Sequence, residues 1–142
     1  MVGSPRSNPV HFDARTAKSI DKGYRSPEIV ALRAHLRSAL ALGRGETVVD
    51  VGCGTGLLCA EMANEVGSNG RVIGVDLSAP MLALAKSRCA DHPEIELHHG
   101  DIHDLPVEDA AADALACMQV LLFVTDVTPT LLEFYRALAP NG

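Results

Sequence analysis

Apolar residues follow two different spacings along the chain, and together they predict strands that alternate with helices. Short β-branched runs, or runs alternating apolar with polar residues, predict strands at residues 46–51, 71–76, 94–98 and 114–120. Apolar residues three or four positions apart predict helices at residues 27–42, 57–66, 81–90 and 129–138. This alternation implies parallel pairing through right-handed crossovers. We therefore predict an α/β fold with a doubly wound, Rossmann-like, mostly parallel sheet in three α/β/α layers.

The first 45 residues divide into an arm and a helical segment that precede the main domain at residues 46–142. Residues 1–10 hold Gly, Ser, Asn and two Pro among few apolar side chains, which predicts a mobile arm. Residues 11–45 form an N-terminal cap segment, in which residues 12–25 show no clear period. The helix that follows is capped by Ser26, and its apolar face consists of Ile29, Leu32, Leu36 and Leu40.

Length, composition and charge limit the classes of function. The chain has 142 residues, 47% of them hydrophobic and 21% charged, which is typical of a globular protein. Its net charge of −6 argues against nucleic acid or an anionic membrane as a partner. Its longest apolar run is too short to cross a bilayer. The four cysteines form no C-x-x-C pair and show no zinc-ligand spacing, so we expect a cytoplasmic protein with reduced thiols and no metal.

A glycine-rich loop after the first predicted strand is the strongest local signal. Gly52, Gly54 and Gly56 allow a tight turn and leave room for a ligand beside the free N–H groups of the next helix. The dinucleotide fingerprint G-x-G-x-x-G would need glycine at position 57, where this chain has Leu57. The spacing thus disfavours a pyrophosphate ligand. The alternative is an ordinary strand-to-helix turn that needs glycine for its conformation alone.

Two acidic residues follow the next two predicted strands. Asp76 ends the second strand, where a carboxylate can accept both hydroxyls of a ribose, although it could also cap the helix that follows. Asp101 lies at the same edge of the sheet and could accept from the exocyclic amine of a purine, or could bond its own backbone in a turn. The loop and the two acids together describe a nucleoside site with no phosphate requirement.

These features resemble the class I S-adenosylmethionine-dependent methyltransferases, of the small-molecule branch with ubiquinone/menaquinone-type and arsenite-type enzymes. The resemblance extends from Phe12 to Gly142. The matching segments are Asp50–Gly56, Val75–Ser78 with Met81, Gly100–Ile102 before Leu105 and Pro106, Asp113–Val124, and Leu131–Gly142.

The resemblance implies a role for each matching residue in binding S-adenosylmethionine. The methionine part would be held by Asp50 and the loop residues Gly52, Gly54 and Gly56, with Cys53 belonging to the same loop. The ribose would bind Asp76. The adenine would contact Leu77, Met81, Asp101 and Ile102. Gln119 would line the pocket after the fourth strand, and Tyr24 would close over the cofactor unless it is an ordinary packing tyrosine.

The function that the resemblance implies is transfer of a methyl group from S-adenosylmethionine to a small-molecule acceptor by in-line displacement. Because the sulfonium is already activated, alignment supplies most of the acceleration, and a base is needed only where the acceptor must lose a proton. No side chain combines a motif match with a base role, so no catalytic residue is assigned. The alternatives are a cofactor-binding module without catalysis and an NAD-dependent oxidoreductase.

Members of this family continue with a fifth strand, a further helix and a strand hairpin, whereas this chain ends at Gly142. The resemblance therefore implies the cofactor-binding half of a methyltransferase, which lacks the last strands and much of the acceptor pocket. Residues 114–120 would then keep an unpaired apolar edge that contains no charge or proline. We expect this edge to pair in a homodimer or to make the chain poorly soluble.

Overall fold

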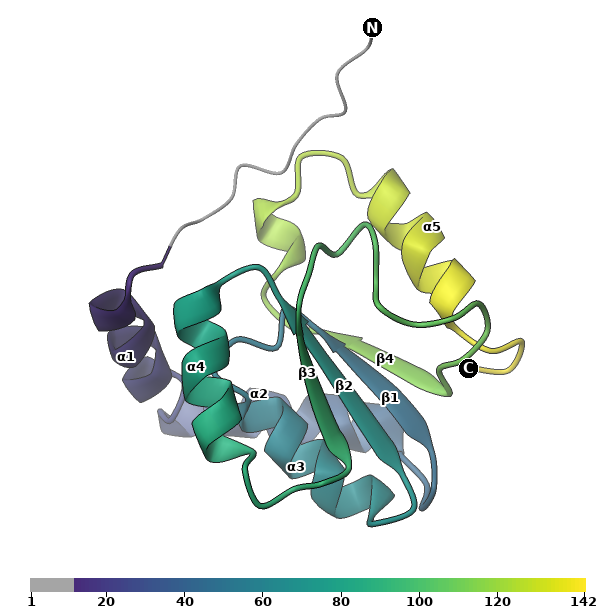
Figure 1. The fold of residues 1–142 in the computed structure, drawn as a ribbon, viewed down its shortest axis with the longest axis horizontal. Helices are drawn as coiled ribbons and strands as arrows, with labels where there is room; N and C mark the ends of the chain where they lie inside the picture. Colours follow the sequence, from purple (N-terminus) through teal and green to yellow (C-terminus); the bar gives the residue numbers. More distant parts are fainter. Residues whose placement is uncertain (1–11) are drawn as a thin grey trace, which may run out of the picture.

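The computed structural model describes residues 12–142, so the predicted arm at residues 1–10 lies outside the described residues. Its four strands form one parallel sheet in the order β3-β2-β1-β4 (Figure 1). The strands are β1 (Thr47–Val51), β2 (Arg71–Asp76), β3 (Ile95–His99) and β4 (Ala114–Cys117). The strand order reverses at β1, because β2 and β3 extend to one side and β4 to the other. This arrangement confirms the predicted doubly wound α/β fold.

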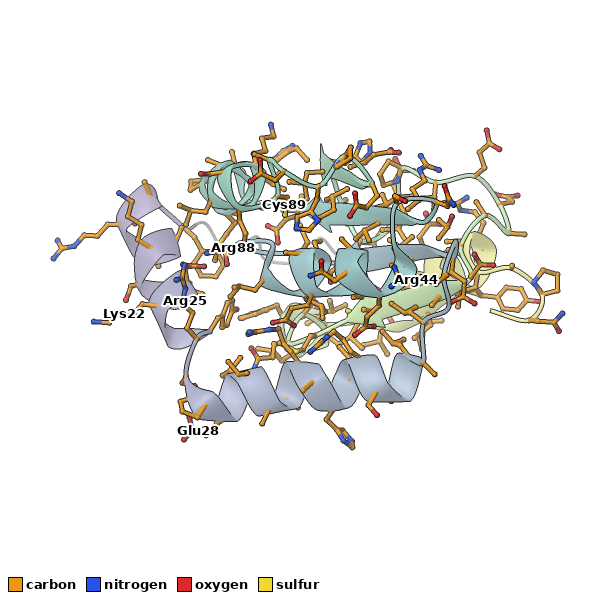
Figure 2. All side chains as sticks on the ribbon, turned by 90° about the horizontal axis from the view of Figure 1, so that it is seen from below. Lys22, Arg25, Glu28, Arg44, Arg88 and Cys89 are labelled. Carbon is orange, nitrogen blue, oxygen red and sulfur yellow. The ribbon has the colours of Figure 1, made fainter. Side chains whose placement is uncertain are left out.

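Helices cover both faces of the sheet. They are α1 (Ala14–Gly23), α2 (Pro27–Leu40), α3 (Leu57–Val66), α4 (Ala79–Arg88), the short 3₁₀ helix η1 (Leu121–Phe123) and α5 (Thr128–Ala137). Successive residues of β1 point to opposite faces, so Val48 packs with α3 and α4 whereas Val49 packs with α5. Figure 1 shows α5 apart from the group of α1 to α4, and Figure 2 shows α2 as a separate layer beside the sheet.

Two elements differ from the prediction near the N-terminus. Helix α1 was not predicted, because its sequence is mostly polar and Ala17 is its one buried residue. It begins where Asp13 caps it by accepting from the Thr16 amide at 2.7 Å. In α2, the predicted inward residue Leu32 is 43% exposed, and the adjacent Arg33 is buried instead.

The segment after β4 also departs from the predicted strand at residues 114–120. The strand ends at Cys117, and Gln119 has a left-handed φ of +59°, which turns the chain out of the sheet into η1. Within residues 12–142, β4 is an edge strand and pairs with β1. Pairing of that edge with a second copy stays a prediction, as does the boundary between residues 45 and 46.

Helix α5 is tied to the long connection between β3 and β4 by Arg136. Its guanidinium donates to the carbonyls of Val107 and Leu105 at 2.9 and 3.2 Å and pairs with Glu133 one turn earlier. Glu133 in turn accepts from the Leu105 amide at 2.7 Å. This network orders an irregular segment that satisfies few of its own backbone groups. No helix within residues 12–142 is long and apolar enough to cross a membrane.

Candidate cofactor site

A pocket of about 540 Å³ opens at the carboxyl ends of β1, β2 and β4, at the place where the strand order reverses. Ligands of open α/β sheets bind at this position. Its wall consists of Phe12, Ile20, Gly23, Tyr24, Ile29, Gly52, Gly54, Asp76, Leu77, Ser78, Met81, Ile102, Met118, Gln119, Val120, Phe123 and Val124. Most of these side chains are apolar, and Asp76 is the one carboxylic acid among these described residues.

The glycine loop is held by the backbone of β2. The amides of Gly52 and Cys53 both donate to the carbonyl of Val75, at 2.8 and 3.0 Å. Gly52 has a φ of +72°, and a Cβ at this position would clash with the side chain of Val120. Gly56, with a φ of +80°, starts α3 and lies against Ala85 of α4. Glycine at these two positions therefore allows the loop to turn and the helices to approach.

Asp76 joins the glycine loop to the start of α4. One carboxylate oxygen accepts from the Gly54 amide and the other from the Ser78 amide, both at 2.8 Å. Ser78, as predicted, caps α4 by accepting from the Met81 amide. Burial raises the pKa of Asp76, while the two amides and His99 oppose this change. Each carboxylate oxygen can accept a further hydrogen bond, and Asp76 lines the pocket.

Tyr24 lies over the glycine loop. Its ring would be 3.9 Å from a Cβ on Gly54, and its side chain lines the pocket. Burial and the nearby negative charge of Asp76 raise the pKa of its phenol. Its backbone carbonyl accepts from Arg33 at 2.6 Å, which fixes the turn between α1 and α2. The structure therefore brings together two residues, Tyr24 and Asp76, that are 52 positions apart.

Asp50 is buried behind the glycine loop. It contributes to a small cavity of about 40 Å³ next to the main pocket, together with Cys53. Its carboxylate accepts from the Cys59 thiol at 3.2 Å. Burial, with a smaller contribution from the charge of Asp76, raises the pKa of Asp50 to about 7. The interaction with the Cys53 side chain, burial and the nearby charge of Asp50 raise the pKa of the Cys59 thiol, which favours an uncharged, structural side chain.

Asp101 makes contacts within its own turn, which was the alternative to a contact with a purine. One of its carboxylate oxygens accepts from the His103 amide at 3.0 Å and contacts His103 Nδ1 at 2.8 Å. His103 Nε2 contacts the Thr130 hydroxyl on α5 at 3.1 Å. Ile102, which follows Asp101 in the sequence, lines the pocket, whereas Asp101 is not among the lining residues. Contact between Asp101 and an adenine stays a prediction.

The structure thus gathers eight of the twelve predicted site residues in one pocket wall and places the other four around it. Those in the wall are Tyr24, Gly52, Gly54, Asp76, Leu77, Met81, Ile102 and Gln119. Asp50 and Cys53 line the adjoining cavity, Gly56 supports the loop at α3, and Asp101 lies in the loop after β3.

Sequence reasoning missed the apolar outer wall of the pocket. It is formed by Phe12, Ile20, Ile29, Met118, Val120, Phe123 and Val124. Phe12 and Ile20 belong to the segment at residues 12–25 that shows no clear period, whereas Ile29 was assigned to the apolar face of a predicted helix. Met118 and Val120 were assigned to the predicted strand, and Phe123 and Val124 lie just after it. Within residues 12–142, no group of three or more His, Cys, Asp and Glu side chains is placed to hold a metal ion.

Comparison with known proteins adds independent findings. A family model described as a methyltransferase domain matches residues 48–142. The chain is 36% identical over 110 residues to a demethylmenaquinone methyltransferase of Staphylococcus epidermidis, covering 78% of this chain and 46% of the relative. It is 40% identical over 132 residues to an uncharacterized 37.1 kDa protein in transposon TN4556 of Streptomyces fradiae, covering 93% of this chain and 36% of the relative.

A solved structure shows the same fold with a ligand. The SAM-dependent methyltransferase from Geobacter sulfurreducens, in complex with S-adenosyl-L-homocysteine, has a TM-score of 0.66 and 28% identity. The alignment covers 82% of this chain and 46% of that chain. This chain therefore spans less than half the length of these relatives.

Proposed function

Because this chain belongs to the methyltransferase-domain family, in its class I S-adenosylmethionine-dependent form, we propose that it transfers a methyl group to a small apolar acceptor. S-adenosylmethionine is the cofactor of this family. The family match confirms the relationship that the motifs predict, and the comparisons give no support to an NAD-dependent oxidoreductase.

The residues of the pocket suit the parts of this cofactor. Asp76 can accept from two ribose hydroxyls, because its oxygens bind the Gly54 and Ser78 amides and still retain acceptor sites. Leu77, Met81 and Ile102 offer an apolar slot for the adenine. The glycine loop leaves its inner side open for the methionine part, with the Asp50 carboxyl behind it.

The cofactor supplies an activated methyl group, and the protein's task is to hold an acceptor in line with it. The rigid loop between β1 and α3 fixes one reactant, and the pocket wall restricts the other. Such positioning can contribute roughly 7–11 kcal/mol to lowering a barrier. Tyr24 and apolar side chains line the space in which the acceptor would meet the methyl group.

The apolar outer wall carries the proposal about the acceptor. Beyond Asp76 and the glycine loop, the pocket is lined by Ile20, Ile29, Phe123 and Val124. Among residues 12–142, this part of the wall offers no charged side chain to a polar acceptor. A demethylmenaquinone methyltransferase among the relatives supports an acceptor of the hydrophobic quinone class.

Calorimetric titration with S-adenosylhomocysteine tests the cofactor site. We expect the parent chain to bind, and Asp76→Ala to lose at least tenfold in affinity, because charge-assisted hydrogen bonds contribute about 1.5–3 kcal/mol each. Asp101→Ala should lose less, since its carboxylate contacts its own loop. NAD serves as the control ligand. Equal losses in the two variants, or a parent chain that binds NAD instead, would contradict the proposal.

A methyl-transfer assay tests the acceptor class. A demethylated quinone, supplied in its reduced hydroquinone form as the nucleophile, and a water-soluble phenol of similar acidity are compared with radiolabelled cofactor. We expect label in the hydroquinone, which loses a proton as it gains the methyl group, and little label in the phenol. Comparable transfer to both would refute the part played by the apolar wall and leave the cofactor site unaffected.

A further inference from the structure

Arg88 lies where three elements around the pocket meet. It is the last residue of α4, and its side chain is 19% exposed. Its guanidinium donates to the Thr55 carbonyl in the glycine loop and to Asp21 Oδ2 on α1 at 3.1 Å, and it forms an ion pair with Asp21 Oδ1 at 2.9 Å. Figure 2 shows Arg88 near α1, with Arg25 close by. One side chain therefore links the glycine loop to α1.

Helix α1 covers the pocket from the N-terminal side. Ile20 of α1 and Tyr24, which ends the helix, both line the pocket. Asp21 lies between them in the sequence, and its carboxylate is 13% exposed. An ion pair that is this well shielded is stronger than one on the open surface, because water competes less for its charges. Movement of α1 away from the pocket would break this pair.

A second arginine, Arg33, fixes the turn that follows α1 by attaching it to α3. Arg33 of α2 donates to the Tyr24 carbonyl at 2.6 Å and to both carboxylate oxygens of Glu61 on α3 at 3.0 and 3.1 Å. This contact attaches the α1–α2 turn to α3. Arg33 can therefore hold the turn in place while α1 itself swings, whereas Arg88 opposes such a swing and also contacts the loop.

We propose that Arg88 and Asp21 are positioning residues of the cofactor site, which fasten α1 over the pocket and couple its position to the glycine loop. We call the contacts of Asp21, Arg88 and Thr55 the α1 latch. A ligand that fixes the loop holds the Thr55 carbonyl in place for Arg88, and Arg88 then holds α1. By linkage, the closed latch strengthens binding of the ligand to the same extent. The identity of that ligand rests on the proposed function, but the latch does not.

Hydrogen exchange and binding together test the α1 latch. In Asp21→Asn, residues 14–24 should exchange at least tenfold faster than in the parent, whereas exchange in α3 stays unchanged. The Kd for S-adenosylhomocysteine should rise about tenfold in Arg88→Gln, as expected for loss of a shielded charge-assisted contact, and at least as much in Asp21→Asn, which also loses the pair with Arg25 at 2.8 Å. Arg88→Lys keeps the charge but has one nitrogen, so it should fall between the parent and Arg88→Gln.

Glu96→Gln provides the matched control. It breaks the bidentate pair of Arg71 and Glu96, with contacts at 2.6 and 2.9 Å, at the start of β2 and away from the pocket. This control should change the Kd by less than twofold and leave α1 unchanged.

Three results would overturn the latch: unchanged exchange in α1, an equal increase in α3, or faster exchange in α1 with an unchanged Kd. A parent chain that binds no S-adenosylhomocysteine would instead refute the proposed function, since exchange of α1 in the unliganded variants is read separately.

Discussion

The two faces of the sheet are built in opposite ways. On the face that carries α3 and α4, which we call the rigid side, the glycine loop and Asp76 are fixed by backbone hydrogen bonds, and α3 buries five of its ten residues. On the face that carries α5, which we call the open side, the helix has the same length but buries three residues, and its outer surface exposes Leu131, Leu132 and Tyr135. The rigid side specifies one geometry for a ligand at the glycine loop. The open side leaves apolar surface exposed, and none of the residues of α5 belongs to the described pocket wall.

The largest expected effect concerns glycines with a left-handed backbone, of which Gly56 is tightly packed and Gly45 is not. Gly56→Ala should lose about 3 kcal/mol of unfolding free energy, from a left-handed backbone and from crowding against Ala85, whose Cβ would lie 3.0 Å away. Gly45→Ala is the control, because φ is +85° there but no atom lies within 4 Å of the new Cβ. It should lose about 1 kcal/mol. Urea unfolding measures both, and equal losses would show that the packing around Gly56 is not tight.

The next effect concerns the buried acid on the same side. Burial raises the pKa of Asp50 from 3.8 to about 7, so the folded chain binds this proton more tightly than the unfolded chain. Stability should therefore fall as the pH rises from about 4 to 7 and level off above. Asp50→Asn removes this dependence and should reduce the loss between pH 5 and pH 8 by roughly 2 kcal/mol. Urea unfolding of parent and variant at both pH values checks this, and parallel losses would contradict it.

The smallest effect is expected on the open side. Leu132→Ser and Tyr135→Ser change side chains that are 64% and 83% exposed, so each should alter stability by no more than about 0.5 kcal/mol. Phe134→Ala, on the inward face of the same helix, serves as the contrast and should destabilise by several times that amount. Large losses from the two serine variants would mean that the outer face of α5 is covered in solution.

The sequence predicted the rigid side well because local rules determine it. The glycines after a β-branched strand, the Ser78 cap and the acid at the end of β2 all act on neighbouring residues, and the structure places them as expected. Parallel pairing followed from the alternation of strands and helices, so the order of the elements could also be read from the sequence.

The features that were not predicted from the sequence depend on contacts between residues that are far apart in the chain. Helix α1 has few apolar residues and buries Ala17 alone, and it is held by packing against α4 and by the pairing of Asp21 with Arg88. Leu32 was predicted to face inward, but Arg33 takes that place because Glu61 and the Tyr24 carbonyl neutralise and bind it. The left-handed turn at Gln119 likewise gave no local signal. The turn contacts of Asp101 depend in part on Thr130, 29 positions away.

The Arg136 network also bears on how such a protein can evolve. Arg136 binds the carbonyls of Leu105 and Val107, and Glu133 binds the amide of Leu105. Replacing either side chain would therefore leave these backbone groups, and the other side chain, without a hydrogen-bond partner. Purifying selection should therefore act on these two positions together, because a single replacement leaves its partner unsatisfied. The outer face of α5 is exposed instead and can change more freely; it consists of Leu131, Leu132 and Tyr135. One helix thus allows descendants to change its exposed surface while they inherit the contacts that order residues 105–107.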